Sequence, residues 1–267
     1  MLKPDQTEPE HNLKTIDLVS IMLILIGIML FTTPLISPWA GKAEFFLTEL
    51  LMFVVVLLFI KLQGFPVKKL IRWNPLPRKI WMSVTMLVVG NVILLDELDR
   101  VVSLIMPMPI ERIEELNMAF KFTSVGDAIW IILGVVIAAP IIEETIFRGI
   151  FQGTLERSIN PTQAVLWTSL IFAILHFQIW WIIQLLILSV VLGYLCWRSN
   201  SIFPAVLIHT GNNLMTILLM NTPDQLSFGF YLWHGHVNPL LLLIALALFW
   251  FGFKSFESGF TNSRYLK

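Results

Sequence analysis

The stretch DAIWIILGVVIAAPIIEETIFRGIF, residues 127–151, combines a long apolar run with two adjacent carboxylates near its end. No ionisable residue stands between Ala128 and Ile142, and Glu143, Glu144 and Arg148 then follow. An apolar run of this length is typical of a membrane-spanning helix, where a charged side chain costs about 3 kcal/mol or more. Charged residues in such helices usually face a polar interior and have a function there. The glutamate pair therefore predicts a functional site inside a membrane protein.

The composition agrees with this interpretation. Hydrophobic residues make up 57% of the 267-residue chain and charged residues only 13%, which is typical of an integral membrane protein built from helices. The net charge is zero, so we expect no nucleic-acid partner. Cys196 is the only cysteine, which excludes an intrachain disulfide and a cysteine-rich zinc site.

Hydropathy predicts an all-α protein with about eight transmembrane helices, each apolar over roughly 15–25 residues. The predicted spans are 18–39, 43–62, 80–95, 127–151, 162–177, 179–197, 201–221 and 239–253. They form one polytopic membrane domain over residues 18–253, between an N-terminal tail (1–17) and a C-terminal tail (254–267). A short interfacial helix is expected around residues 111–121.

The distribution of basic residues predicts the orientation. Eight spans place both termini on one side of the membrane, and only four of the 18 Lys and Arg residues fall in loops on the other side. These four are Lys42, Arg100, Arg112 and Lys121. Because cytosolic loops are rich in Lys and Arg, both termini are expected in the cytosol. The basic stretch 68–79 is expected to contact anionic lipid headgroups.

Three further polar groups lie inside apolar spans. His176 is in the fifth predicted span, and His209 and Asn213 are four residues apart on one face of the seventh. The fourth and fifth spans form a hairpin in which Glu143 lies 17 residues before Asn160 and His176 lies 16 after it. In an antiparallel hairpin these two side chains are at nearly the same depth. His209 lies eight residues into span seven, about 12 Å along the helix, and meets them if the hairpin projects into the cytosol. A cluster of carboxylate, two imidazoles and amide on spans four, five and seven is therefore compatible with the spacing.

This set of side chains supports two kinds of chemistry. A carboxylate in a low-dielectric pocket can act as a general base on water, while imidazole and amide groups stabilise an oxyanion. Alternatively, Glu143, His176 and His209 provide the ligands of a zinc ion with an open position for water. The interpretation of Glu144 and Arg148 without a catalytic role is an ion pair at the membrane surface, with Arg148 reaching the cytosol.

Three segments resemble the motifs of a known family. Glu143-Glu144-Thr145-Ile146-Phe147-Arg148-Gly149 resembles the EExxxR motif of the CPBP/Abi family, which includes the type II CAAX prenyl endopeptidases (Ras-converting-enzyme-like). Phe172-Ala173-Ile174-Leu175-His176 is similar to its FxxxH motif, and His209-Thr210-Gly211-Asn212-Asn213 to its HxxxN motif. The resemblance covers about residues 127–217, and all three motifs occur in the family's order on apolar spans.

The resemblance implies an eight-helix intramembrane endopeptidase and a role for each motif residue. Glu143 would activate water, with Glu144 or Arg148 in support, and His176 would position the water or polarise the carbonyl. His209 and Asn213 would stabilise the oxyanion. A metal-free mechanism is favoured, with zinc on Glu143, His176 and His209 as the alternative. The implied partner is a membrane-associated peptide or protein, possibly lipidated, and the compact chain suggests a bacterial plasma membrane.

Two other functions fit the same residues. A non-catalytic immunity or regulatory protein could use this fold to bind a peptide. A proton-coupled transporter could use buried Glu and His side chains as a relay, although the chain shows no inverted repeat of the kind common in transporters. Two more charged features stand apart: Glu49 inside the second span, with Lys42 as a candidate partner, and an external HxH pair, His234 and His236.

Overall fold

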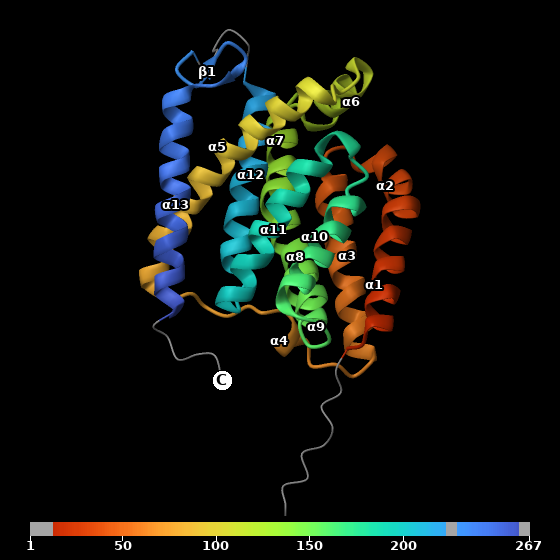
Figure 1. The fold of residues 1–267 in the computed structure, drawn as a ribbon. Helices are drawn as coiled ribbons and strands as arrows, with labels where there is room; N and C mark the ends of the chain where they lie inside the picture. Colours follow the sequence, from red (N-terminus) through yellow and green to blue (C-terminus); the bar gives the residue numbers. More distant parts are fainter. Residues whose placement is uncertain (1–12, 223–228, 262–267) are drawn as a thin grey trace, which may run out of the picture.

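The computed structural model describes residues 13–222 and 229–261, and nearly all of them are helical (Figure 1). The α-helices are α1 (Thr15–Gly27), α2 (Thr33–Ala40), α3 (Ala43–Leu62), α4 (Val67–Leu70), α5 (Trp81–Ile105), α6 (Ile110–Phe120), α7 (Val125–Ile131), α8 (Ala139–Glu144), α9 (Gly153–Leu155), α10 (Pro161–Leu175), α11 (Ile182–Ser199), α12 (Phe203–Asn221) and α13 (Pro239–Thr261). The π-helical segments are η1 (Ile28–Thr32), η3 (Ile132–Ala138) and η4 (Thr145–Gln152), and the 3₁₀ turns are η2 (Arg78–Ile80) and η5 (Ile179–Trp181). Strands β1 (Leu232–Trp233) and β2 (His236–Val237) form a small antiparallel hairpin.

Seven helical runs among the described residues are long and apolar enough to cross a membrane. They are Thr15–Thr32, Ala43–Leu62, Arg78–Ile105, Val125–Leu155, Ile179–Ser199, Phe203–Asn221 and Pro239–Thr261. The remaining predicted span is α10, whose 15 residues extend only about 22 Å, against a hydrocarbon thickness of about 30 Å. The all-α membrane fold is confirmed, with α10 too short to cross by itself.

The predicted helix boundaries agree with the structure to different degrees. The helix predicted at 43–62 is α3, with the same ends. Two predictions stop too early: the helix predicted to end at 95 continues to Ile105, and the one predicted to end at 253 continues to Thr261. Both extensions carry charged residues that find partners elsewhere in the fold. The interfacial helix predicted around 111–121 is α6.

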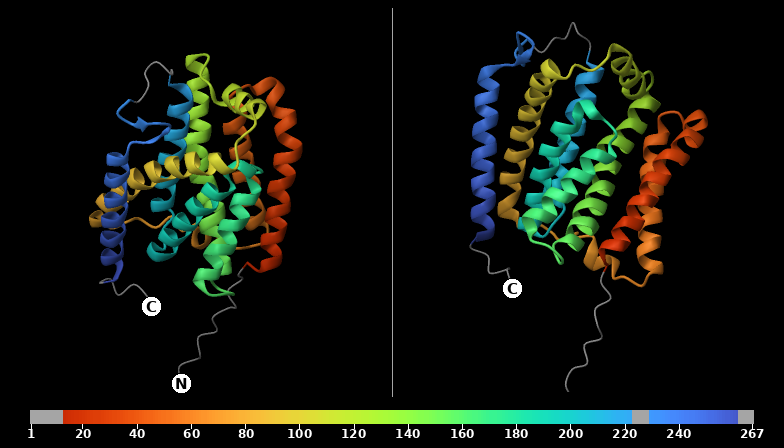
Figure 2. Two further views of the ribbon diagram at one scale, coloured as in Figure 1. Left: turned by 45° about the horizontal axis from the view of Figure 1, so that its top comes forward. Right: turned by 45° about the vertical axis from the view of Figure 1, so that its right-hand side comes forward.

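The helix that carries both glutamates lies near the middle of the bundle. In Figures 1 and 2 the run α7–α9 stands between α1–α3 on one side and α11 and α12 on the other, with α5 and α13 beyond. The first described residues of α1 and the last of α13 lie at the same end of the bundle (Figure 1). This end is the one that the distribution of basic residues predicts to be cytosolic.

Two apolar clusters flank this central helix. One joins α1 and α3 to the α8–η4 segment and to α10, and the other joins α5, α11, α12 and α13. Gly134 allows a close approach between α3 and the central helix, because a Cβ there would lie 2.7 Å from the backbone nitrogen of Phe46. The position of the second predicted span beside the fourth therefore depends on a residue without a side chain.

The external HxH pair does not point to a shared ligand. His236 Nδ1 lies 2.8 Å from Glu97 Oε1, while the ring of His234 packs edge-on against Trp233. The neighbouring Tyr231 hydroxyl donates to Asp96, and burial together with this carboxylate raises the pKa of Tyr231 well above its usual value. The hairpin therefore fastens the loop before α13 to the end of α5.

Candidate active site

The two glutamates end a short α-helix that lies between two π-helical segments. Pro140 is in the first turn of α8, directly after η3, and it lacks the N–H that a regular helix would use there. Every residue of η4 is buried. Irregular turns of this kind occur frequently at functional sites, because they redirect side chains that a regular helix would place elsewhere. Here they direct Glu143 and Glu144 into the bundle.

Glu143 faces both histidines predicted from the sequence. Its Oε2 atom lies 3.9 Å from Nε2 of His176 and 3.9 Å from Nε2 of His209. These distances are too long for direct hydrogen bonds. The same oxygen is buried and has no hydrogen-bond partner in the protein. An unpaired carboxylate oxygen between two ring nitrogens leaves a position for a small polar molecule that bridges them.

The other ring nitrogen of each histidine defines its orientation. His176 is the C-cap of α10, and its Nδ1 lies 2.8 Å from the Phe172 carbonyl oxygen. Because a carbonyl can only accept, Nδ1 carries the proton, and Nε2 of the neutral ring is an acceptor. His209 Nδ1 lies 2.9 Å from Glu144 Oε1, so it donates in the same way to an ionised carboxylate. Both Nε2 atoms are therefore turned toward Glu143.

Glu144 and Arg148 form an ion pair inside the protein. Arg148 Nε lies 3.1 Å from Glu144 Oε2, in a geometry closer to a simple ion pair than to an aligned hydrogen bond, and both side chains are completely buried. Arg148 also donates to Ser189 Oγ at 2.8 Å, and its guanidinium lies 4.5 Å from the ring centre of Phe172. The predicted ion pair at the membrane surface, with Arg148 reaching the cytosol, is therefore wrong, because the Arg148 side chain has no exposed area.

Asn213 is the candidate whose side chain bonds to the backbone of the central helix rather than to another side chain of the site. It is one turn beyond His209 on α12, and its Nδ2 donates to the Val135 carbonyl at 2.9 Å. Val135 precedes Glu143 by about two turns of the central helix. The amide has a second N–H, which that hydrogen bond does not use. The structure thus brings Glu143, Glu144, Arg148, His176 and His209 together, and it joins Asn213 to the same central helix through Val135.

Glu49 is a polar neighbour that the sequence analysis did not assign to the site. On α3 it shares a face with Phe46, Phe53 and Val56, which pack into the same apolar cluster as the α8–η4 segment. Its carboxylate interacts electrostatically with Glu143, and its Oε2 is buried without a hydrogen-bond partner. Lys42, the expected partner, donates instead to backbone carbonyls of α6. The spacing Phe46, Glu49, Phe53, Val56 is the sequence signal that could have indicated an inward position.

The donor atoms are spaced more widely than zinc requires. Two ligands of a tetrahedral zinc ion stand about 3.3 Å apart, given bonds of about 2.0–2.1 Å. Both distances from Glu143 to the histidines are 3.9 Å. Among the residues that the structure describes, no group of three His, Cys, Asp or Glu side chains is arranged to hold a metal ion. The side chains as placed are therefore too widely spaced to hold a zinc ion without moving.

The comparison with known families agrees with the motifs. Residues 125–215, from α7 into α12, match the family described as type II CAAX prenyl endopeptidase Rce1-like. This segment contains all six predicted site residues, and its limits are close to the 127–217 that the motifs suggest. Neither the curated proteins nor the solved structures include a significant match to the chain.

Proposed function

We propose that this multi-pass membrane protein hydrolyses a peptide bond at its buried glutamate site. The premise is the match of residues 125–215 to the Rce1-like family of type II CAAX prenyl endopeptidases. One observation carries the proposal: Glu143 Oε2 is buried, has no protein partner, and faces two ring nitrogens across gaps of 3.9 Å. A water molecule is the bridging group that suits such gaps.

The proposed reaction begins with that water. It donates one hydrogen to Glu143 and the other to the unprotonated Nε2 of His176, so its oxygen lone pairs are free to attack the substrate carbonyl carbon. Glu143 takes the proton as the carbon–oxygen bond forms. When the carbon–nitrogen bond breaks, Glu143 returns this proton to the departing amine. The Glu143 carboxylate therefore serves first as the base and then as the acid, while His176 orients the water.

The oxyanion that forms needs donors on the opposite side of the carbonyl. His209 can donate from Nε2 only when both its nitrogens are protonated, and Glu144 on Nδ1 stabilises that imidazolium during the reaction. The unused N–H of Asn213 is the second candidate donor. Glu144 is held in turn by Arg148, so this ion pair acts as the support that orients His209 rather than as a base.

The location of the site supports our proposal for the substrate class. Glu143 lies within a run long and apolar enough to span a membrane, so we propose a membrane-associated peptide or protein, with or without an attached lipid, as the substrate. We place the reaction at a plasma membrane of the bacterial type, with the end that holds both described termini in the cytosol.

The most direct test is identification of the substrate. Membrane peptides are compared between cells that express the wild-type chain and cells that express Glu143→Ala at equal levels. We expect fragments with new termini in the wild type alone, and the corresponding full-length proteins to accumulate in the variant. Identical peptide patterns, with both proteins correctly inserted, would contradict an endopeptidase and favour the immunity or regulatory function.

A second prediction concerns metals. Cleavage by the purified protein should continue after dialysis against a strong chelator, because the water is activated by Glu143 and oriented by His176. The measurement is the cleavage rate together with the metal content of the same sample. Loss of activity that returns in proportion to added zinc, up to one ion per chain, would instead favour coordination by Glu143, His176 and His209.

A further inference from the structure

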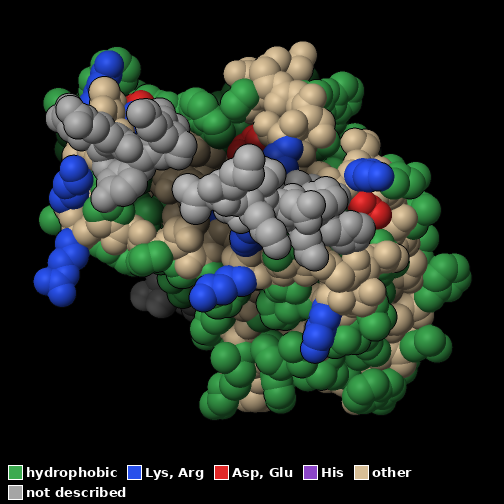
Figure 3. Space-filling view, turned by 90° about the horizontal axis from the view of Figure 1, so that it is seen from below, with side chains coloured by type: hydrophobic (Ala, Val, Ile, Leu, Met, Phe, Trp, Pro, Cys, Tyr) green, Lys and Arg blue, Asp and Glu red, His purple; other side chains and the backbone are tan. Residues whose placement is uncertain are grey.

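A short segment directly after α4 lies across the central helix, at the end of the bundle where α1 begins and α13 ends. We call this segment, residues 71–74, the strap; it lies outside the segment that matches the family. Gly149 lets the strap lie directly on η4, because a Cβ there would be 3.0 Å from the backbone of Leu70 and Ile71. Figure 3 shows this end of the molecule, where Lys and Arg side chains clearly outnumber acidic ones, as expected of the cytosolic side.

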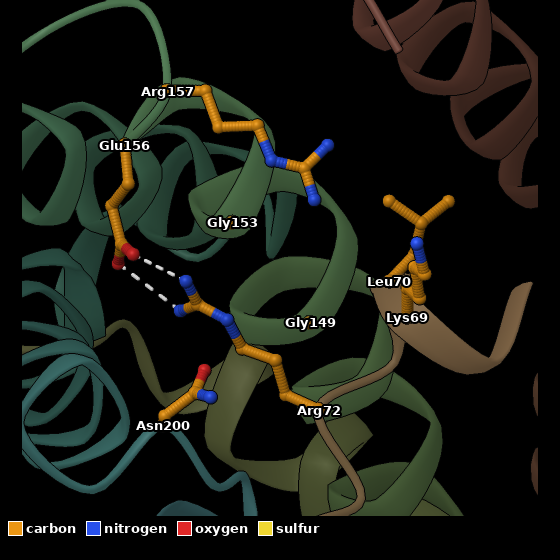
Figure 4. A pocket seen from close by; sticks show the side chains of 8 residues that line it. All are labelled: Lys69, Leu70, Arg72, Gly149, Gly153, Glu156, Arg157 and Asn200. Atoms are coloured by element: carbon orange, nitrogen blue, oxygen red, sulfur yellow. Dashed lines mark hydrogen bonds and ion pairs between the residues drawn. The ribbon is translucent and has the colours of Figure 1, made fainter. Parts of the chain in front are cut away.

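The strap is joined to the end of the central helix on one side and to the start of α12 on the other. Arg72 Nη1 donates to Glu156 Oε1 at 3.1 Å, just after α9 (Figure 4). On the other side the Ile202 N–H donates to the Arg72 carbonyl oxygen at 3.1 Å, and Asn74 Nδ2 donates to the Asn200 carbonyl oxygen at 2.6 Å. Arg72 has a left-handed backbone conformation, with φ at 51°, which a residue with a side chain keeps only where its surroundings determine it. The path of the strap is therefore set by its contacts with both helices.

Trp73, in the middle of the strap, contacts both of these helices. Its Nε1 donates to Thr145 Oγ1 at 3.0 Å, and its ring centre lies 6.4 Å from that of Phe203. Thr145 directly follows Glu144 on the central helix. Phe203 begins α12, six residues before His209 and thus about 9 Å from it along the helix. The indole therefore connects the two helices that carry the Glu144–His209 hydrogen bond, on the side of that bond nearer the strap.

We propose that Trp73 is a positioning residue, which keeps α12 at a fixed distance from the central helix. The hydrogen bond that depends on this distance joins His209 Nδ1 to Glu144 Oε1 and is 2.9 Å long. Because a displacement of about 1 Å can cost about 10²-fold in rate, a loosely held α12 would slow cleavage even with every catalytic side chain present. This consequence for cleavage rests on the proposed function, whereas the connection between the two helices does not. The alternative is a tryptophan that only anchors the chain at the membrane interface.

The test observes the His209 hydrogen bond directly and needs no substrate. Full-length protein with isotope-labelled histidine is placed in lipid nanodiscs, and NMR measures how fast the His209 Nδ1 proton exchanges with water. His209→Gln identifies this signal by removing it. The variants are Trp73→Ala and Trp73→Phe, the second of which keeps an aromatic ring but has no N–H for Thr145. The matched control is Trp81→Ala at the same end of the bundle, since Trp81 is 45% exposed and Trp73 is 46% exposed.

Proton exchange at His209 should be about tenfold or more faster in Trp73→Ala, intermediate in Trp73→Phe, and within about twofold of wild type in Trp81→Ala. In the cleavage assay, Trp73→Ala should lower kcat about tenfold and leave KM within about twofold, because a positioning residue does not touch the substrate. Unchanged exchange in both Trp73 variants would overturn the proposal. Equal changes in the Trp73 and Trp81 variants would overturn it as well, since they would show only interfacial anchoring. A rise in KM alone would also count against it, because it would place Trp73 in contact with the substrate. A wild-type chain that cleaves no peptide would contradict the proposed function and leave the exchange result as the test of Trp73.

Discussion

We expect Glu143→Gln to lower kcat for peptide cleavage by about 10²–10⁴-fold and to leave KM nearly unchanged, which is the range for loss of a general base. The amide keeps the size and position of the side chain but cannot accept a proton from water. The variant should fold at least as well as wild type, because the buried Oε2 atom of Glu143 has no protein partner to lose. The measurements are steady-state cleavage kinetics and thermal unfolding on the same preparations.

Two controls make this result specific. Glu114→Gln removes one carboxylate from the exposed surface of α6 and should change neither kcat nor the unfolding temperature. Glu143→Asp keeps a carboxylate but withdraws it by one methylene from the histidines, so its rate should fall between those of wild type and Glu143→Gln. A Glu143→Gln protein that cleaves at the wild-type rate would rule out Glu143 as the base. A large fall in its unfolding temperature would show that Glu143 is instead needed for folding.

The sequence predicts most helices well because lipid leaves little choice of structure. A membrane-spanning segment must satisfy its backbone internally, so a long apolar run is a helix wherever it occurs. The predictions of α5 and α13 end early because Asp96, Asp99 and Glu257 look like helix ends in isolation. In the fold these residues have distant partners: Tyr231 for Asp96, Gln184 for Asp99, and Arg198 for Glu257. Side-chain pairing across the bundle is not readable from local hydropathy.

The candidate site likewise has one part that the sequence predicts and another part that depends on packing between helices. The sequence could place Glu143 and His176 at the same membrane depth, because depth in a helical hairpin follows from the number of residues to the turn. It could not place Glu49, because the position of Glu49 beside Glu143 depends on how α3 packs against the central helix, and that packing depends on Gly134. Burial of Arg148 likewise depends on α11, which provides Ser189 as a partner.

Breaking the Glu144–Arg148 ion pair by substitution should produce the largest effect on stability. Arg148→Met leaves the fully buried Glu144 carboxylate with His209 as its remaining side-chain partner among the described residues, and unpairing a buried charge typically costs about 3–5 kcal/mol. We therefore expect little correctly folded Arg148→Met protein in detergent extracts, measured by size-exclusion profile and unfolding temperature. Arg198→Met is the comparison, because Arg198 forms its ion pair with Glu257 in a partly exposed setting and should cost far less.

A second substitution separates the structural role of this pair from its proposed role in orienting His209. Glu144→Gln together with Arg148→Met removes both charges, so the double variant should unfold at a higher temperature than Arg148→Met alone. Its cleavage should nevertheless remain low, because an amide at position 144 no longer stabilises the imidazolium of His209. Recovery of both stability and cleavage in the double variant would argue that Glu144 only neutralises Arg148. A double variant no more stable than Arg148→Met would mean that the guanidinium is needed for its contacts with Ser189 and Phe172, rather than for its charge.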